Sequence, residues 1–239
     1  MTDKNYKVLK AFIEAPEELV YAACLNFLKK KYLEKNIAAT PTYIYAAGTT
    51  PITLVAHLDT VLSKPAKVRY NKLTNILRGT AGLGADDRAG VFLIIKLIQA
   101  GYRHNILFTT GEELGGLGAL DFIKEHPKAP NKTNFIIELD RRNAADAVFY
   151  DCGNQEFKSF ILDYGFKEAK GLFSDISFIA PAWNIAAVNL SIGYYNEHTL
   201  KEFLKPKDLE NTYRKVCKIL STHQIPFFSY VGGEEWKNY

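Results

Sequence analysis

Histidines and carboxylates that could bind a metal ion follow several apolar segments of this sequence. His57 and Asp59 come directly after the apolar run 52–55. In a strand, residues two apart point to the same side, so this imidazole and carboxylate can face one site. The imidazole can then bind a metal ion while the carboxylate fixes the orientation of the ring. A single His-x-Asp pair is more often a polar strand edge, so the rest of the set decides.

Further acids and a late histidine occupy the same kind of position. They are Glu112 and Glu113 after the apolar segment 105–110, Asp140 after 133–139, and His198 in the loop after 186–190. Because the carboxyl ends of parallel strands share one edge of a sheet, these groups can converge there. Two histidines with several carboxylates and no thiolate suit Zn²⁺, Mn²⁺ or Co²⁺. The set is large enough for two ions.

A glycine-rich turn at 82–84 leads through Asp86 and Asp87 into the apolar helical segment 91–98. Taken locally, a helix N-cap and a first-turn acid explain both residues. Taken with the other acids, Asp86 becomes a candidate ligand that a helix would carry to the same edge.

Apolar strands alternating with helical patterns must position these residues. Strands are expected at 42–46, 52–56, 105–110, 133–139 and 186–190, a hairpin at 67–78, and helices at 16–36, 91–98, up to about 125, 154–162 and 207–221. The first two strands are expected to pair around Gly48. Near-continuous apolar strands between helices are typical of a mostly parallel sheet covered on both faces. The sequence therefore predicts one α/β domain over residues 1–239, with 225–239 as a mobile tail.

Composition excludes several classes of function. The net charge is +4 and the basic residues are spread along the chain, which argues against a nucleic-acid partner. No segment resembles a membrane span or a secretion signal, so we expect a cytoplasmic protein without a membrane partner. Three widely separated cysteines without a Cys-x-x-Cys pair argue against a thiolate metal site and a disulfide framework.

Five short motifs, in this order, resemble the co-catalytic zinc exopeptidases and amidohydrolases of the peptidase T, aminoacylase and glutamate carboxypeptidase group. The motifs are His57-Leu58-Asp59-Thr60, Gly84-Ala85-Asp86-Asp87-Arg88-Ala89-Gly90, Gly111-Glu112-Glu113, Asp140, and Asn196-Glu197-His198-Thr199. The resemblance covers about residues 50–200, and the Gly-Ala-Asp-Asp stretch is most similar to peptidase T. It implies the zinc exopeptidase-like phosphorylase/hydrolase fold and two divalent metal ions, zinc first, with manganese or cobalt as alternatives.

The same resemblance implies a role for each residue. The implied metal ligands are His57, Asp86, Glu113, Asp140 and His198, with Asp86 bridging the two ions. Asp59 would orient the ring of His57. Glu112 would be the general base that takes a proton from the metal-activated water and passes it to the leaving amine. A cis peptide bond is expected between Asp86 and Asp87.

Two of these assignments leave an alternative. Asp87 could take the bridging place of Asp86, although the spacing to Gly90 favours Asp86. Glu138 could replace Asp140, because strand alternation puts both on the same side. Asp140 lies nearer the end of the strand and is therefore preferred.

The sequence departs from peptidase T between Asp140 and His198. Lidded relatives insert a whole domain there, whereas this chain has only residues 141–197. We therefore expect a catalytic core without a lid or dimerisation domain. Candidates for the groups that the lid would supply are Tyr194, Tyr195, Arg141, or a neighbouring subunit of a homo-oligomer.

These features predict metal-dependent hydrolysis of an amide bond in small peptides, of the aminopeptidase or tripeptidase kind. The first alternative is an amidohydrolase that acts on N-acyl amino acids or cell-wall-type peptides, using the same metal chemistry. The second alternative is an inactive scaffold or binding protein of the same fold. The presence of Glu112 and of every expected ligand argues against an inactive protein.

Overall fold

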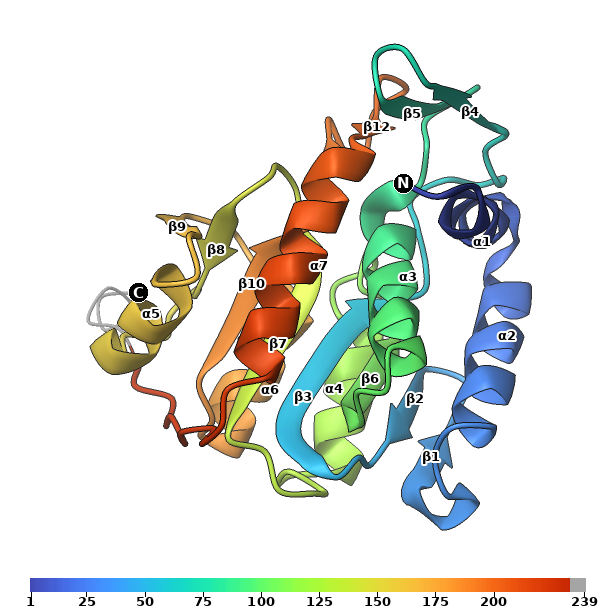
Figure 1. The fold of residues 1–239 in the computed structure, drawn as a ribbon. Coiled ribbons are helices and arrows are strands. Elements are labelled where there is room, and N and C mark those ends of the chain that lie inside the picture. Colours follow the sequence, from blue (N-terminus) through green and yellow to red (C-terminus); the bar gives the residue numbers. More distant parts are fainter. Residues whose placement is uncertain (233–239) are drawn as a thin grey trace.

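The computed structural model describes residues 1–232, which form a mixed sheet of eight strands with helices on both faces (Figure 1). The strands of this sheet are β1 (Ile37–Ala39), β2 (Tyr43–Ala46), β3 (Thr50–His57), β6 (His104–Thr109), β7 (Phe135–Arg141), β8 (Asp146–Val148), β9 (Lys167–Ala169) and β10 (Ala187–Ser191). Their order is β1-β2-β6-β3-β7-β10-β8-β9. The central strands β6, β3, β7 and β10 run parallel. The expected α/β fold with a mostly parallel sheet is confirmed.

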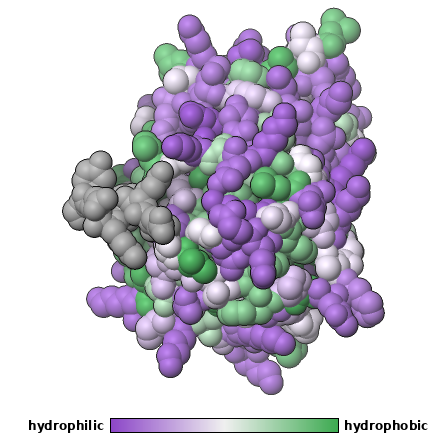
Figure 2. Space-filling model, turned by 90° about the vertical axis from the view of Figure 1, so that its left-hand side faces the viewer, coloured by the Kyte–Doolittle hydropathy of each residue, from purple (hydrophilic) through white to green (hydrophobic). Residues whose placement is uncertain are grey.

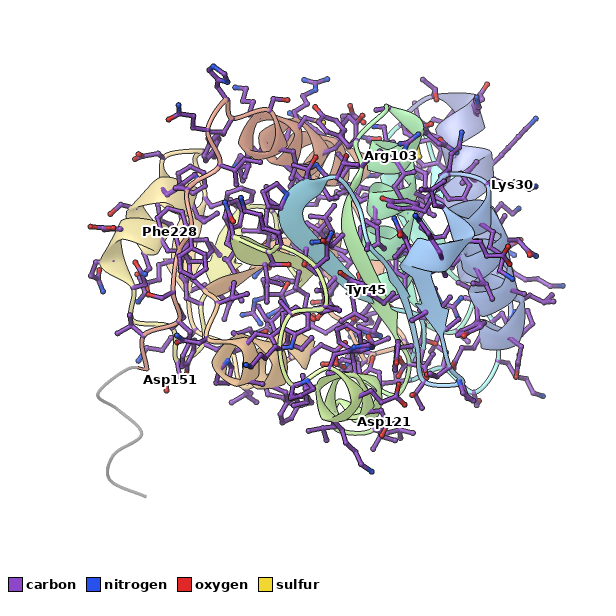
Figure 3. All side chains as sticks on the ribbon, turned by 90° about the horizontal axis from the view of Figure 1, so that it is seen from below. Lys30, Tyr45, Arg103, Asp121, Asp151 and Phe228 are labelled. Carbon is purple, nitrogen blue, oxygen red and sulfur yellow. The ribbon has the colours of Figure 1, made fainter. Side chains whose placement is uncertain are left out.

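Two helical layers cover the sheet, because side chains on each central strand alternate between its faces. On β3, Leu54 packs into one core and Val55 into the other. The first face is covered by α1 (Asp3–Glu14), α2 (Glu17–Lys29), α3 (Ala85–Gln99), α5 (Gln155–Leu162) and α7 (Pro206–Leu220), and the second by α4 (Leu117–Glu125) and α6 (Asp175–Trp183). Figure 3 views these layers from below, with Tyr45 against α4, the helix that carries Asp121.

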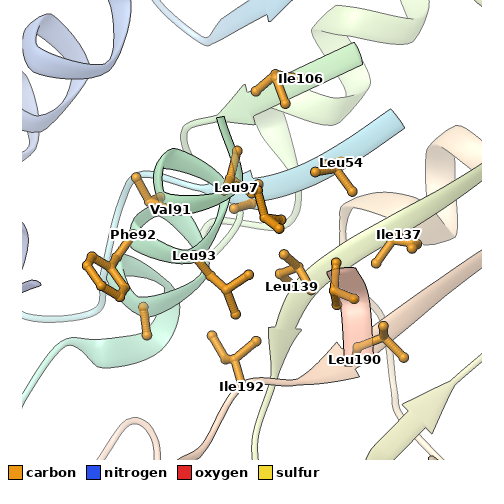
Figure 4. Close-up of a cluster of buried hydrophobic side chains, with 14 of the residues drawn as sticks. Leu54, Val91, Phe92, Leu93, Leu97, Ile106, Ile137, Leu139, Leu190 and Ile192 are labelled. Atoms are coloured by element: carbon orange, nitrogen blue, oxygen red, sulfur yellow. The ribbon is translucent and has the colours of Figure 1, made fainter. Parts of the chain in front are cut away.

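Helix α3 lies at the centre of the larger core. Leu93 and Leu97 of α3 face Leu54, Ile137 and Leu139 of the sheet (Figure 4). These side chains are almost completely buried. Each fully buried leucine or isoleucine contributes about 1.5–3 kcal/mol to folding. The apolar run at 91–98 therefore fixes α3 against the strands, and with it the acids at the start of the helix.

The expected pairing of β2 with β3 is wrong. Strand β6 lies between them, antiparallel to β2 and parallel to β3. Gly48 serves this arrangement, because a Cβ there would come within 2.3 Å of the carbonyl oxygens of Arg103 and His104. The loop therefore passes close over the start of β6 and does not close a hairpin.

The expected hairpin is confirmed as β4 (Val68–Asn71) and β5 (Ile76–Gly79). It joins a second sheet, in the order β11-β12-β5-β4, with β11 (Tyr194–Tyr195) and β12 (Phe203–Leu204). The helix expected over 16–36 is shorter: α2 ends at Lys29, and a 3₁₀ turn, η1 (Glu34–Asn36), leads into β1. The sequence patterns did not predict α1, α6, β1, β8 or β9.

Residues between Asp140 and His198 pack on or beside the sheet. They form β8, α5, β9, α6, β10 and β11. The first part of the expected mobile tail, 225–232, contacts the body through bridges of Ser229 with Ile185 and of Gly232 with Cys152. The rest of that tail, 233–239, lies outside the described residues.

Polar side chains cover most of the face in Figure 2, with hydrophobic residues in separate patches. Among the described residues, no helix combines the length and the apolar character that crossing a membrane requires.

Candidate active site

The candidate ligands meet at the carboxyl edge of the parallel strands. His57 ends β3, Asp140 lies near the end of β7, and Glu113 is in the loop after β6. Asp86 stands at the start of α3, and His198 lies in the loop between β11 and β12. Elements from five parts of the chain therefore deliver one ligand each, as the edge argument predicts for parallel strands.

The His57 half of the cluster is buried. The Nε2 atom of His57 lies 3.3 Å from Oδ1 of Asp86 and 3.4 Å from Oδ1 of Asp140. The other ring nitrogen, Nδ1, lies 3.3 Å from Oδ1 of Asp59. His57 is only 1% exposed. The ring is thus held from behind by Asp59 and presents Nε2 to the two carboxylates.

The His198 half is more open. Its Nε2 atom lies 3.1 Å from Oδ2 of Asp86 and 3.0 Å from Oε1 of Glu113, and its side chain is 50% exposed. The backbone at His198 has a φ of 59°, in the left-handed region that non-glycine residues seldom occupy. This turn directs the imidazole back towards the sheet. Asp86 therefore faces His57 with one oxygen and His198 with the other.

These separations fit bound metal ions. Tetrahedral ligands about 2.0–2.1 Å from a zinc ion lie about 3.3 Å from one another. The donor atoms around His57 and His198 are 3.0 to 3.4 Å apart. Imidazole nitrogens with carboxylate oxygens and no thiolate also suit the divalent ions considered above. The residues present therefore fit two adjacent metal positions that share Asp86.

The two alternative ligands are engaged elsewhere. Asp87 is close enough to His57 and Asp140 to form a metal-sized group with them. However, its Oδ2 accepts the backbone N–H of His57 at 3.2 Å and its Oδ1 that of Gly90 at 3.0 Å. Glu138 is completely buried and accepts a hydrogen bond from the Ser174 hydroxyl. The peptide bond between Asp86 and Asp87 is cis, as the resemblance implied.

Asp140 is held by neighbours that the sequence did not reveal. The Asn189 amide donates to Oδ2 of Asp140 at 3.2 Å, and the Tyr194 hydroxyl donates to the Asp140 backbone oxygen at 2.5 Å. Tyr194 therefore supports this carboxylate. Tyr195 instead donates to Asp208 at 2.7 Å, and Arg141 donates to the Lys170 carbonyl at 2.9 Å. Neither of these two side chains turns towards the candidate ligands.

A family comparison agrees with this geometry. The family model described as Peptidase family M28 matches residues 37–166, which is 130 of the 239 residues. The chain belongs to peptidase family M28. It is a metallopeptidase-like hydrolase, and peptidases of the M28 family are metal-dependent. The zinc exopeptidase group expected from the motifs is thereby supported, without selecting one member.

Solved structures of aminopeptidases share the fold of this M28 chain. A TET aminopeptidase from the marine sediment archaeon Thaumarchaeota archaeon SCGC AB-539-E09 has a TM-score of 0.75 at 15% identity, over 94% of this chain and 98% of that chain. Aminopeptidase PepT from Bacillus cereus ATCC 10987 has 0.71 at 13%, over 90% and 96%. The Pyrococcus horikoshii TET1 peptidase has 0.65 at 12%, over 89% and 98%. No curated protein sequence matches the chain.

Glu112 of this M28 chain lies beside the ligands without joining either histidine closely. Its Oε2 is 4.0 Å from Nε2 of His57, and its backbone N–H donates to Oδ1 of Asp59 at 3.3 Å. Burial raises the pKa of Glu112 to about 9, and the charges of Asp140 and Asp175 act in the same direction, against His57. A carboxylate with a raised pKa beside a cation site can accept a proton readily.

The electrostatics of the cluster favour a positive charge. Hydrogen bonds with Asp86 and Glu113 raise the pKa of His198 to about 10, against the effect of partial burial. Burial and the neighbouring Asp86 raise the pKa of Asp140 to about 7. For Asp86 burial acts upwards, but the two histidines hold its pKa well below the ordinary value. Close carboxylates thus repel one another unless a cation lies between them.

Glu202 supports the site, and the sequence analysis missed it. This carboxylate is 3% exposed and accepts four successive backbone N–H groups. They belong to Leu83, Gly84, Ala85 and Asp86, at 3.0, 2.7, 2.8 and 3.2 Å. Glu202 follows His198 by four residues, so it ties the His198 loop to the segment that carries Asp86. A single glutamate in a loop offered no pattern that would have revealed this.

Proposed function

We propose that this protein is a metal-dependent exopeptidase that hydrolyses small peptides. Two divalent ions, zinc first and manganese or cobalt as alternatives, would be held by the candidate ligands. Those ligands are His57, Asp86, Glu113, Asp140 and His198. The position of Asp86 carries the proposal, because its two oxygens lie 3.3 and 3.1 Å from Nε2 of His57 and of His198. A carboxylate placed in this way can be shared by two ions.

The chain's own residues would then divide the chemistry. When bound, the ions would lower the pKa of a water molecule and polarise the scissile carbonyl. Glu112 takes the proton of the attacking water on its carboxylate. It delivers that proton to the amine nitrogen as the C–N bond breaks, which leaves Glu112 ionised again.

Asp59 couples the two tasks. Its carboxylate contacts the ring of His57 and accepts the backbone N–H groups of Glu112 and Glu113 at 3.3 and 3.1 Å. One buried acid therefore fixes a proposed ligand, the proposed base and a second ligand in one geometry. Such support commonly changes metal affinity or activity about 10–100-fold when it is lost.

The test is metal content together with the Glu112→Gln variant. Protein dialysed against zinc should contain two ions per chain by mass spectrometry, in the wild type and in Glu112→Gln alike. The variant should lose about 10²–10⁴-fold in kcat, because the proton acceptor is gone. Glu156→Gln, on the exposed side of α5, is the matched control and should keep the wild-type rate. Wild-type activity in Glu112→Gln would remove the assignment of the base, and metal-free protein would remove the site.

The substrate panel separates the peptidase from the deacylase that shares its metal chemistry. We expect hydrolysis of dipeptides and tripeptides with a free amino group. Activity confined to N-acetylated amino acids would replace the peptidase by an amidohydrolase. Loss of all activity despite bound metal would favour a binding role for the same fold.

We further propose a catalytic domain without a lid that works as a homo-oligomer in the cytoplasm. The TET1 peptidase of Pyrococcus horikoshii, which shares the fold, can assemble into a tetrahedron or a large octahedral shell. The three cysteines are free thiols, as a reducing compartment allows. Light scattering of the purified chain measures the assembly directly, and a monomer at micromolar concentration would contradict this part.

A further inference from the structure

A cavity of about 510 Å³ adjoins the candidate metal site and has no part in the chemistry above. Asp59 and Glu113 belong to its lining, so it opens directly onto the ligand cluster. The volume lies within the range of about 300–1,000 Å³ that small-molecule sites occupy. A substrate whose carbonyl sits at the ligand cluster would therefore have this cavity beside its scissile bond.

One wall of this cavity is apolar. Val61, Leu114 and Leu117 line it and are 48%, 75% and 46% exposed. Leucine and valine seldom leave so much surface in water without a partner, and three of them border one cavity. An aliphatic chain placed there would cover this surface.

The same cavity also contains an uncompensated carboxylate. Glu17, the first residue of α2, lines it, is half-buried, and makes no hydrogen bond or ion pair within the described residues. Burial raises the pKa of Glu17, and the charge of Asp59 adds to this, while Arg88 opposes it. Interaction with the dipole of α2 explains an acid here, but exposed Glu18 already supplies one in the same turn.

We propose that this cavity binds a lysine or arginine side chain next to the scissile bond, with Glu17 pairing with its charged end. The inference rests on the proposed function, which places the substrate carbonyl at the ligand cluster. Basic side chains combine an aliphatic stem with a cationic head, and the apolar wall and Glu17 match these two parts. A leucine side chain would use only the wall, and an acidic one would meet Glu17, Asp59 and Glu113.

Four dipeptides test the proposal on zinc-loaded enzyme: Lys-Ala, Leu-Ala, Ala-Lys and Ala-Leu. On one side of the scissile bond the lysine peptide should have the higher kcat/KM. Glu17→Gln should reduce that preference about three- to tenfold, mainly through KM, as expected for one partly exposed charged contact. Glu18→Gln is the matched control and should leave the preference unchanged. No preference for lysine, or a preference that survives in Glu17→Gln, would overturn the proposal.

A binding measurement separates this subsite from the proposed function. In a Glu112→Gln background the peptides should bind without being cleaved, and calorimetry gives their Kd. The lysine peptide should bind more tightly than the leucine peptide, and adding Glu17→Gln should abolish the difference. If no peptide is hydrolysed by the wild type but this difference in Kd is found, the subsite stands and the peptidase falls. If peptides are hydrolysed and the Kd values are equal, the subsite falls and the peptidase stands.

Discussion

Two buried histidines lie at opposite edges of the same sheet, and their surroundings differ. His57 ends β3, His104 begins the parallel neighbour β6, and each is 1% exposed. Burial lowers the pKa of His104 to about 4, and its ring nitrogens have no hydrogen-bond partner within residues 1–232. Burial acts in the same direction on His57, but hydrogen bonds with Asp140, Asp59 and Asp86 raise its pKa well above the ordinary value. Burial alone does not mark a site; the surrounding charge does.

The polar groups at the two edges differ in the same way. At the amino edge, Asn105 accepts the backbone N–H of Gly48 at 2.9 Å and the Asn131 amide at 2.8 Å, and donates to Thr133 at 3.1 Å. These groups are neutral and satisfy one another. At the carboxyl edge, an oxygen of Glu138 and one of Asp175 are buried without a hydrogen bond within residues 1–232. The amino edge is therefore complete by itself, whereas the carboxyl edge carries excess negative charge.

Metal removal should have the largest effect, and only on the carboxyl edge. A ligand that binds the folded chain alone stabilises it by about 4 kcal/mol when its free concentration is 1,000 times Kd. We expect the urea midpoint to fall when zinc is replaced by a chelator, and less so in His198→Ala. Identical midpoints with and without zinc would show that the charge at this edge does not require a cation.

Substitutions at the two edges should separate stability from metal binding. Asn105→Ala removes one partner from a buried network and should cost about 1–3 kcal/mol of unfolding free energy without changing zinc affinity. Glu202→Ala leaves buried N–H groups unpaired, so a similar loss is expected, together with about 10–100-fold weaker zinc binding. Chelator competition and urea unfolding on the same samples give both quantities. Equal zinc affinities in the two variants would mean that Glu202 has only a structural role.

The smallest effect depends on pH and concerns His104. Its pKa is near 4 when folded and near 6.5 when unfolded, so between these values the unfolded chain binds more protons. The contribution of neutral His104 is therefore lost as pH falls, by about 2 kcal/mol at pH 5. His104→Leu should remove this loss, so its stability relative to wild type should improve between pH 7.5 and pH 5. A constant difference across that range would contradict the assignment.

Sequence patterns predicted the strand ends well, because β3, β6 and β7 are apolar runs followed directly by polar residues. This placed His57, Glu112 and Asp140 at one edge before any coordinates were considered. Strand order was harder: the pairing of β2 with β6 depends on the fit of Gly48 over a carbonyl, which no local pattern records.

Supporting residues were the hardest to predict. Glu202 contacts Asp86 across 116 positions of sequence, and a lone loop glutamate has no periodicity. Helix α6 was missed because Pro181 interrupts its pattern, although its capping box at Ser174 is an ordinary start signal. Local sequence thus revealed the candidate ligands, while the groups that orient them depend on tertiary contacts.

The position of His198 and Glu202 late in the chain has a consequence for biosynthesis. Every strand of the large sheet, from β1 to β10, precedes residue 192 and leaves the ribosome before this loop does. A nascent chain can therefore assemble its sheet while the second half of the ligand cluster is still missing. By the same reasoning, a single proteolytic cut between residues 196 and 202 would separate the histidine from its anchor and disarm the enzyme without dismantling the sheet.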